Sequence, residues 1–139
     1  MRGPVEVFLS HSSDDAETAI EIARVLGEHG ISAWYAPREI VGSQKWQDEI
    51  GAALRRCDWF VLLLSPGAVR SMWVRRELQY ALIQSRYDGR ITPVLISPCD
   101  PDNLSWVLQT FQQVDLTRRT EGAYSNLLRV WGKEFGPVA

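Results

Sequence analysis

Cysteine and histidine are scarce in this sequence of 139 residues, with two of each: Cys57, Cys99, His11 and His29. The two cysteines form no CxxC pair, and the four residues have none of the spacings that bind structural zinc. A disulfide-stapled scaffold is therefore excluded. The composition favours a reducing compartment, so we expect a cytoplasmic protein that holds no metal ion.

An excess of charge of one sign is also lacking. Fifteen Lys and Arg residues against 17 Asp and Glu residues give a net charge of −2. Proteins that bind nucleic acid usually carry an excess of basic residues, which this sequence does not have. The longest apolar run, Trp59–Leu64, is far shorter than the roughly 20 residues that span a bilayer. No apolar segment typical of a signal peptide stands near the N-terminus. We expect neither nucleic acid nor a membrane as a partner.

Several nucleotide and hydrolase motifs are absent. No GxGxxG follows the first predicted strand, and neither GxxxxGK[ST] nor GxSxG occurs. A phosphoacceptor receiver domain would need an aspartate at the end of the third strand, where Ser65 stands. These absences argue against Rossmann dinucleotide binding, P-loop chemistry, α/β-hydrolases and receiver domains.

Short apolar runs alternate with amphipathic segments along the whole chain. Strands are predicted at 5–9, 31–35, 59–64, 91–96 and, more weakly, 111–116. Helices are predicted after Ser12 and Ser13, after Ser43, after Ser71, and from about Tyr124 to Phe135, with one helical turn near 104–108. This alternation predicts one domain over residues 1–139: a flavodoxin-like α/β three-layer sandwich whose five-stranded parallel sheet has the order 2-1-3-4-5.

Such sheets bind ligands beyond the carboxyl ends of the strands, where the strand order reverses. Here that switch point lies between the first and third strands. The segments Ser10–Ser12 and Ser65–Gly67 end those strands, and Trp34 with Tyr35 ends the second. We therefore expect a ligand crevice among these residues.

Trp73 and Glu77 lie four residues apart on the third predicted helix and so share one face. The buried stripe of this helix is predicted to be Val74, Leu78, Ala81 and Leu82. Glu77 falls at the border of that stripe, where a carboxylate can face a cleft. The alternative is a solvated glutamate paired with Arg76 or Arg70, beside a tryptophan at the rim. The pattern alone leaves both open.

Several stretches in the expected order resemble the TIR (Toll/interleukin-1 receptor) domain family. They are Val7–Ser12, Gly30–Trp34, Pro37–Ile40 with Gly42, Trp59–Ala68, Ser71–Leu78 and Ile91–Val94. The Ala36–Ile40 form of the loop after the second strand, the BB loop, resembles bacterial members. One departure is Tyr35-Ala36-Pro37, where many TIR domains carry an aspartate just after the aromatic.

Some TIR domains cleave NAD⁺ between nicotinamide and ribose. The resemblance implies that Glu77 is the catalytic glutamate and that Trp73 and Trp34 contact the substrate. NAD⁺ would then be a substrate, with no cofactor required. The residue types suit the reaction, because a carboxylate stabilises an oxocarbenium-like state and an indole stacks on a cationic ring.

Other candidates have two interpretations each. Ser10 and His11 would contact ribose or phosphate, or form a turn and cap cluster. Arg38 would bind a phosphate or a neighbouring subunit, and Tyr35 would line the cleft or end its strand. The resemblance assigns self-association to the BB loop, with Pro37, Arg38, Glu39, Ile40 and Gly42.

The sequence therefore predicts an NAD⁺ glycohydrolase or cyclase, activated by assembly into a homo-oligomer and acting in prokaryotic anti-phage immunity. A sensor domain or protein would supply the trigger, and the chain can be a fragment of a longer effector. The main alternative is a non-catalytic TIR–TIR interaction module. A third hypothesis is a module that binds NAD⁺ without turnover.

Overall fold

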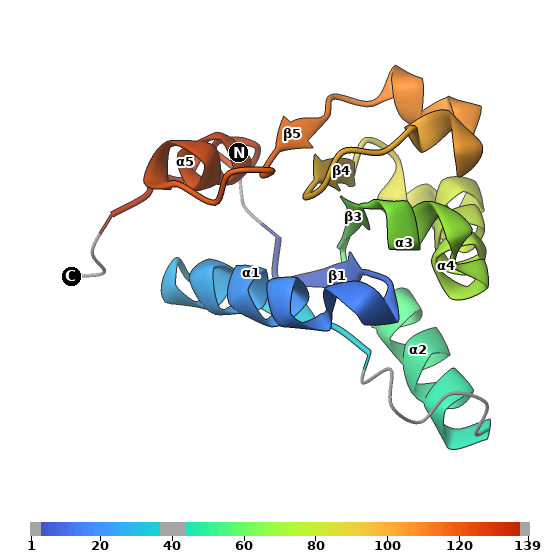
Figure 1. Ribbon diagram of the computed structural model, residues 1–139. Coiled ribbons are helices and arrows are strands. Elements are labelled where there is room, and N and C mark those ends of the chain that lie inside the picture. Colours follow the sequence, from blue (N-terminus) through green and yellow to red (C-terminus); the bar gives the residue numbers. More distant parts are fainter. Residues whose placement is uncertain (1–3, 37–43, 137–139) are drawn as a thin grey trace.

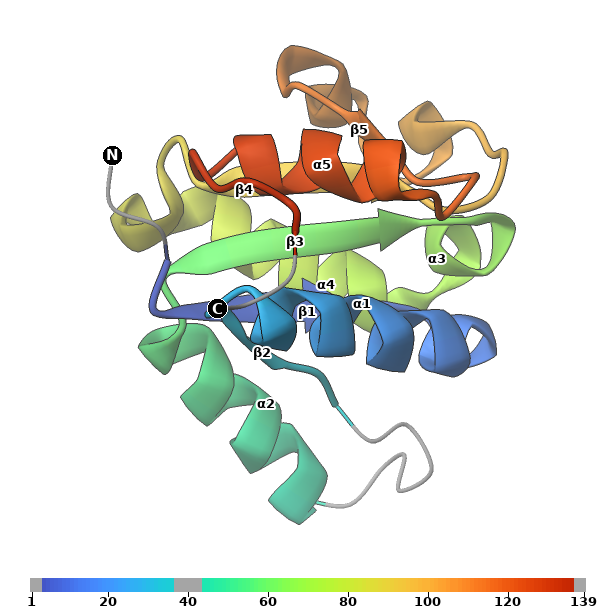
Figure 2. The same cartoon turned by 90° about the vertical axis from the view of Figure 1, so that its left-hand side faces the viewer.

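The computed structural model describes residues 4–36 and 44–136, with only the backbone of 44–46. Its centre is a parallel sheet of five strands in the order β2-β1-β3-β4-β5. The strands are β1 (Glu6–Ser10), β2 (Ser32–Trp34), β3 (Trp59–Leu64), β4 (Ile91–Leu95) and β5 (Val114–Asp115). The predicted fold class and strand order are confirmed, and Figures 1 and 2 show the arrangement from two sides.

Helices cover both faces of the sheet (Figure 1). They are α1 (Ala16–Glu28), α2 (Gln44–Arg56), α3 (Pro66–Arg70), α4 (Met72–Ile83) and α5 (Glu121–Arg129). Short 3₁₀ turns span Ser13–Asp15, Ser85–Tyr87, Pro101–Asn103 and Trp106–Thr110. One apolar cluster lies between the sheet and α1 with α5, and a second lies between the sheet and α2 with α4. Below, these are called the α1/α5 face and the α2/α4 face.

Successive strand residues point to opposite faces, as the pleat requires. In β1, Val7 and Leu9 pack on the α1/α5 face, and Phe8 packs on the α2/α4 face. In β3, Val61 and Leu63 alternate in the same way with their neighbours. Because both faces are covered, β3 is apolar throughout and every residue in it is buried, as predicted for a central strand.

The structure differs from the predicted secondary structure in two short segments, one at the fifth strand and one after the third strand. The strand predicted at 111–116 contains only Val114–Asp115, because only these residues pair with β4. The segment Ser65–Gly67, predicted only to end the third strand, instead caps and begins α3 (Pro66–Arg70). Ser65 accepts a hydrogen bond from the Ala68 N–H (3.0 Å), and Pro66 occupies the first turn, where its missing N–H costs nothing.

The predicted last helix is also too long. Helix α5 ends at Arg129, and Gly132, at φ +67°, turns the chain. The Lys133 N–H donates to the Leu128 carbonyl and the Gly132 N–H to that of Arg129, which terminates the helix. Trp131 is buried beyond the helix end, against Trp59 at 5.9 Å between ring centroids.

The predicted start of α4 is confirmed, whereas that of α1 is not. The Ser71 side chain accepts from the Val74 N–H at 3.2 Å, which confirms it as the cap of α4. Residues 13–15 form a 3₁₀ turn, so α1 begins at Ala16, later than predicted. The predicted cap Ser43 lies outside the described residues.

Candidate functional site

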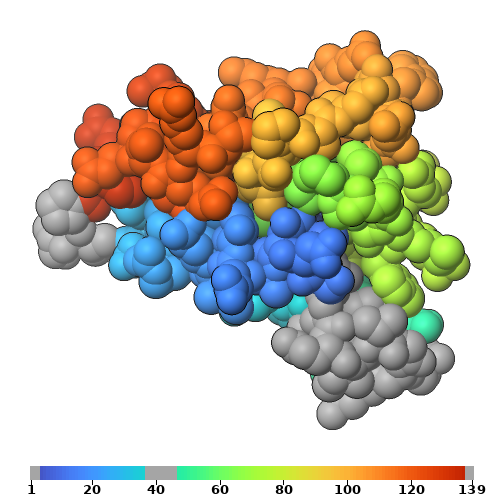
Figure 3. Space-filling view, viewed as in Figure 1, coloured from blue at the N-terminus to red at the C-terminus, as the bar shows by residue number. Residues whose placement is uncertain are grey.

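The loops that follow β1 and β3 are joined to each other at the switch point. The Ser12 hydroxyl donates to Asp15 Oδ2 at 2.8 Å, and the Ser65 hydroxyl donates to the same oxygen. A Cβ on Gly67 would lie only 2.7 Å from Ser12 Oγ, so the two loops touch. Their segments meet at the surface in Figure 3. The loops after β1 and β3 are therefore linked through Asp15 on the α1 side, and the predicted ligand crevice stays a prediction.

A second polar pair lies on the α2/α4 face of the sheet. Ser10, the last residue of β1, donates its hydroxyl to Glu77 Oε1 of α4 at 2.7 Å. Ser10 is 0% exposed and Glu77 is 2% exposed. The alternative of a solvated Glu77 is wrong, because the helix turns this side chain inward with Val74, Leu78 and Ala81.

Two tryptophans flank this face. Trp34 and Trp73 are partly buried and pack against the same apolar cluster, and the Trp34 ring lies 5.2 Å from that of Phe8. The Arg76 guanidinium lies over the Trp73 ring, 5.3 Å from its centroid, which is a cation–π arrangement. The α2/α4 face thus brings together a buried carboxylate, a serine hydroxyl and two indoles.

Two other predicted site residues lie on the opposite face. Tyr35 packs against the apolar cluster of the α1/α5 face. The His11 ring is edge-on to Tyr35 at 6.3 Å between centroids, and its Nδ1 lies 3.4 Å from the Leu9 carbonyl oxygen. Both residues lie just beyond the ends of β1 and β2, and Tyr35 packs on the face opposite to the one that carries Glu77. Their predicted contact with substrate stays a prediction.

The BB-loop residues Pro37, Arg38, Glu39, Ile40 and Gly42 lie outside the described residues. Their predicted roles in phosphate binding and self-association therefore remain predictions.

The cysteines have the character of structural residues. Burial raises the pKa of the Cys57 thiol to about 12, and burial also raises the pKa of Cys99. A thiol with a raised pKa is protonated at neutral pH and is a poor nucleophile. His29 caps the end of α1, where its Nδ1 lies 2.7 Å from the Val25 carbonyl oxygen, as expected for a residue at a helix C-terminus.

Within the part of the chain that the structure describes, no group of three or more His, Cys, Asp and Glu residues is placed to hold a metal ion. A bilayer-spanning helix is likewise not found among these residues.

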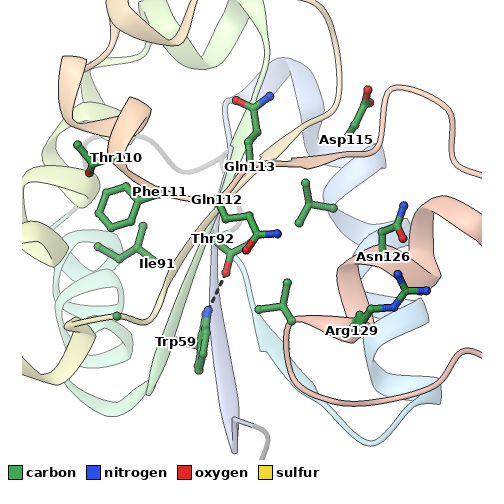
Figure 4. Close-up of a pocket in the computed structure, with 13 residues that line it drawn as sticks. Trp59, Ile91, Thr92, Thr110, Phe111, Gln112, Gln113, Asp115, Asn126 and Arg129 are labelled. Atoms are coloured by element: carbon green, nitrogen blue, oxygen red, sulfur yellow. Dashed lines mark hydrogen bonds between the residues drawn. The ribbon is translucent and has the colours of Figure 1, made fainter.

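A pocket of about 740 Å³ lies at the β4–β5 edge (Figure 4). It exists because β5 is short, so residues 111–113 stand off from Ile91 and Thr92. Trp59 forms part of its wall and donates from Nε1 to Thr92 Oγ1 at 2.9 Å. The sequence analysis missed this pocket, and the only signal for it was the weakness of the fifth predicted strand.

Comparison with known proteins identifies TIR domains both by sequence and by fold. Residues 7–128 match the family model described as TIR domain. The chain is 23% identical over 91 residues to the probable 2' cyclic ADP-D-ribose synthase TcpO of Methanobrevibacter olleyae, covering 65% of this chain and 27% of the relative. It is 26% identical over 74 residues to the 2' cyclic ADP-D-ribose synthase BtTIR of Bacteroides thetaiotaomicron, covering 52% and 26%.

Among solved structures, the TIR domain of the Toll-related receptor TRR-2 from Hydra magnipapillata superposes with a TM-score of 0.70 at 20% identity. The alignment covers 88% of this chain and 94% of that one, which shows a shared fold. By contrast, the match spans only about a quarter of the length of the two curated relatives. Because the family model matches residues 7–128, most of the sequence, this chain belongs to the TIR domain family.

Proposed function

We propose that this chain cleaves NAD⁺ at the bond between nicotinamide and ribose, with Glu77 as the catalytic residue. The observation that carries the proposal is a buried carboxylate beside the carboxyl end of β1, on the same face as two partly buried tryptophans. The names of the two curated relatives, both cyclic ADP-D-ribose synthases, support the same chemistry.

The reaction begins when the bond between ribose C1 and the nicotinamide nitrogen breaks. The electron pair leaves with nicotinamide, which becomes neutral, and C1 takes on oxocarbenium character. Water then attacks C1 to give ADP-ribose and a proton. In cyclisation, a hydroxyl of the same molecule attacks instead, giving a cyclic ADP-ribose and a proton.

The proposed role of Glu77 is to stabilise the positive charge that develops on the ribose and to accept hydrogen bonds from its hydroxyls. A fixed carboxylate shielded from water acts more strongly than one in bulk solvent, because the effective dielectric around it is lower. Nicotinamide leaves as a neutral molecule, so the step needs no strong general acid.

Trp73 and Trp34 are proposed to bind the substrate through their rings. An indole face attracts a cation, and the Trp73 ring already faces the Arg76 guanidinium. The positively charged nicotinamide ring of NAD⁺ is a flat cation of the kind that such a surface binds. His11 and Tyr35 lie on the other face of the sheet, so we place them outside the reacting centre.

Assembly into a homo-oligomer through the BB loop is proposed to activate the enzyme, with a sensor domain or separate protein as trigger. We further propose a role in prokaryotic anti-phage defence, in which loss of NAD⁺ halts the infected cell. The two curated relatives come from an archaeon and a bacterium, which supports the prokaryotic part of this proposal. It would be tested by comparing phage plaquing on cells that express the wild type or Glu77→Gln.

The enzymatic proposal is tested with purified protein, NAD⁺ and mass spectrometry over a range of protein concentrations. We expect release of nicotinamide that rises more steeply than the protein concentration and is at least about 100-fold slower in Glu77→Gln. The mass of the second product distinguishes hydrolysis from cyclisation. If the protein self-associates but leaves NAD⁺ intact, the proposal is wrong. Retained binding of NAD⁺ would then indicate a binding module, and its absence a TIR–TIR interaction module.

A further inference from the structure

Ser10 and Glu77 are both held on rigid elements. The backbone of Ser10 lies in β1, between β2 and β3, and is in register with Leu62 of β3. Glu77 lies in the middle of α4, beside Val74 and Leu78, which are 0% and 1% exposed. The 2.7 Å hydrogen bond between them therefore connects the centre of the sheet to the covering helix.

A serine hydroxyl has a single proton to donate. In this structure that proton is donated to Glu77 Oε1, and Ser10 has no exposed surface. The hydroxyl proton is therefore already committed to Glu77 and is not available to donate to a ribose or phosphate oxygen. The bond to Glu77 therefore favours a role for Ser10 in holding the carboxylate over donation to a phosphate.

We infer that Ser10 is a positioning residue, whose hydroxyl holds the Glu77 carboxylate in its reacting orientation and does not itself bind NAD⁺. The inference rests on the proposed function of Glu77. A glutamate side chain has several rotatable bonds, so anchoring one carboxylate oxygen restricts the direction in which the group acts. Hydrogen bonds to an ionised acceptor are roughly twice as strong as neutral ones, which suits this purpose.

Three variants separate positioning from substrate binding. Ser10→Ala removes the donor without adding bulk, and Ser10→Cys keeps a weaker donor of similar shape. Thr92→Val is the matched control, because it deletes another buried hydroxyl and its hydrogen bond to Trp59, on β4 and away from Glu77. For each variant, kcat and KM for NAD⁺ are measured along with the unfolding midpoint.

We expect Ser10→Ala to lower kcat by about 10- to 100-fold, the scale of a small misplacement of a reacting group, with KM changed less than twofold. Ser10→Cys should be intermediate, and Thr92→Val should keep both constants within about twofold. A raised KM with unchanged kcat would instead identify Ser10 as a binding residue. An unchanged kcat in Ser10→Ala would equally overturn the inference.

A second readout needs no turnover. The unfolding equilibrium constants of wild type, Ser10→Ala, Glu77→Ala and the double variant form a thermodynamic cycle. We expect the effect of the double variant to be at least fivefold smaller than the product of the single effects. If the wild type leaves NAD⁺ intact, the proposed function fails, and this cycle alone decides whether Ser10 holds Glu77. Independent single effects would then overturn the inference as well.

Discussion

Two hydroxyl–carboxylate clusters stand beside the carboxyl end of β1, built from the same groups but in different surroundings. In one, Ser10 donates to Glu77, and both residues are almost completely buried. In the other, Ser12 and Ser65 both donate to Asp15, which is only half-buried. The first links the sheet to the middle of a helix, whereas the second links two loops.

The surroundings explain why we assign catalysis to one cluster and stability to the other. Asp15 directly precedes α1, where a negative charge interacts favourably with the helix dipole. Glu77 is in the middle of α4, where the dipole offers no comparable benefit, and its burial removes hydration that a carboxylate prefers to keep. A costly buried carboxylate on the same sheet face as two partly buried tryptophans is typical of a site used for chemistry.

The largest expected effect separates the two carboxylates by activity. We expect Glu77→Gln to lower NAD⁺ cleavage by about 100- to 1,000-fold, since it removes the charge that stabilises the transition state. Asp15→Asn should keep activity per folded molecule within about threefold. Initial rates, corrected for the folded fraction, measure both. Equal losses in the two variants would remove the distinction between the clusters.

For the free energy of unfolding, we expect the opposite order, with the larger loss on substitution of Asp15 and the smaller on substitution of Glu77. Asp15→Ala removes the acceptor of two hydroxyls and should cost about 2 kcal/mol of unfolding free energy, after allowance for its partial exposure. Glu77→Ala should cost less, because the loss of the hydrogen bond is offset by removal of a carboxyl group that is costly to bury. Urea unfolding compares them, and a larger loss for Glu77→Ala would contradict this view.

A glycine pair tests how tightly the loop cluster is packed. A Cβ at Gly67 would meet Ser12 Oγ at 2.7 Å and Asp14 Oδ2 at 2.9 Å, so Gly67→Ala should destabilise by about 1.5 kcal/mol. Gly27, inside α1, has nothing within 4 Å, and Gly27→Ala should stabilise by about 0.5 kcal/mol. Melting temperatures should therefore shift in opposite directions. A shift of the same sign in both would show that the loops adjust freely.

The smallest expected effect compares neighbours on opposite faces of the sheet. Trp34→Leu should raise KM for NAD⁺ about fivefold, the scale of one lost ring contact of about 1 kcal/mol. Tyr35→Leu should change KM less than twofold, because Tyr35 packs on the α1/α5 face. Steady-state kinetics measure KM for NAD⁺ in the two variants. A larger effect at Tyr35 would extend the binding site around the strand end.

The periodicity of the sequence predicted most of the fold, since buried strands and amphipathic helices have strong patterns. The segment at 111–116 was harder, because polar Gln112 and Gln113 interrupt its alternation and only Val114–Asp115 pair with β4. Helix α3 was missed because Ser65-Pro66-Gly67 is as typical of a turn as of a capped helix start.

Among the candidate site residues, the sequence placed Trp73 and Glu77 on one helix face but could not say whether that face was buried. The answer depended on where α4 packs against β1, which brings Ser10 within 2.7 Å of Glu77 across 67 residues of chain. The same holds for Tyr35 and His11, which looked like neighbours of Trp34 and Ser10 but point to the other face.

By itself, the sequence determined the alternation of strands and helices, the parallel sheet and the resemblance of the chain to the TIR domain family. Local periodicity and short-range motifs carry that information. Only the tertiary structure decided which hydroxyl meets which carboxylate: Ser10 with Glu77, and Ser12 with Ser65 on Asp15. These contacts join residues distant in the chain, and their geometry follows from the pleat of the strands and the packing of helices on the sheet, which no local pattern encodes.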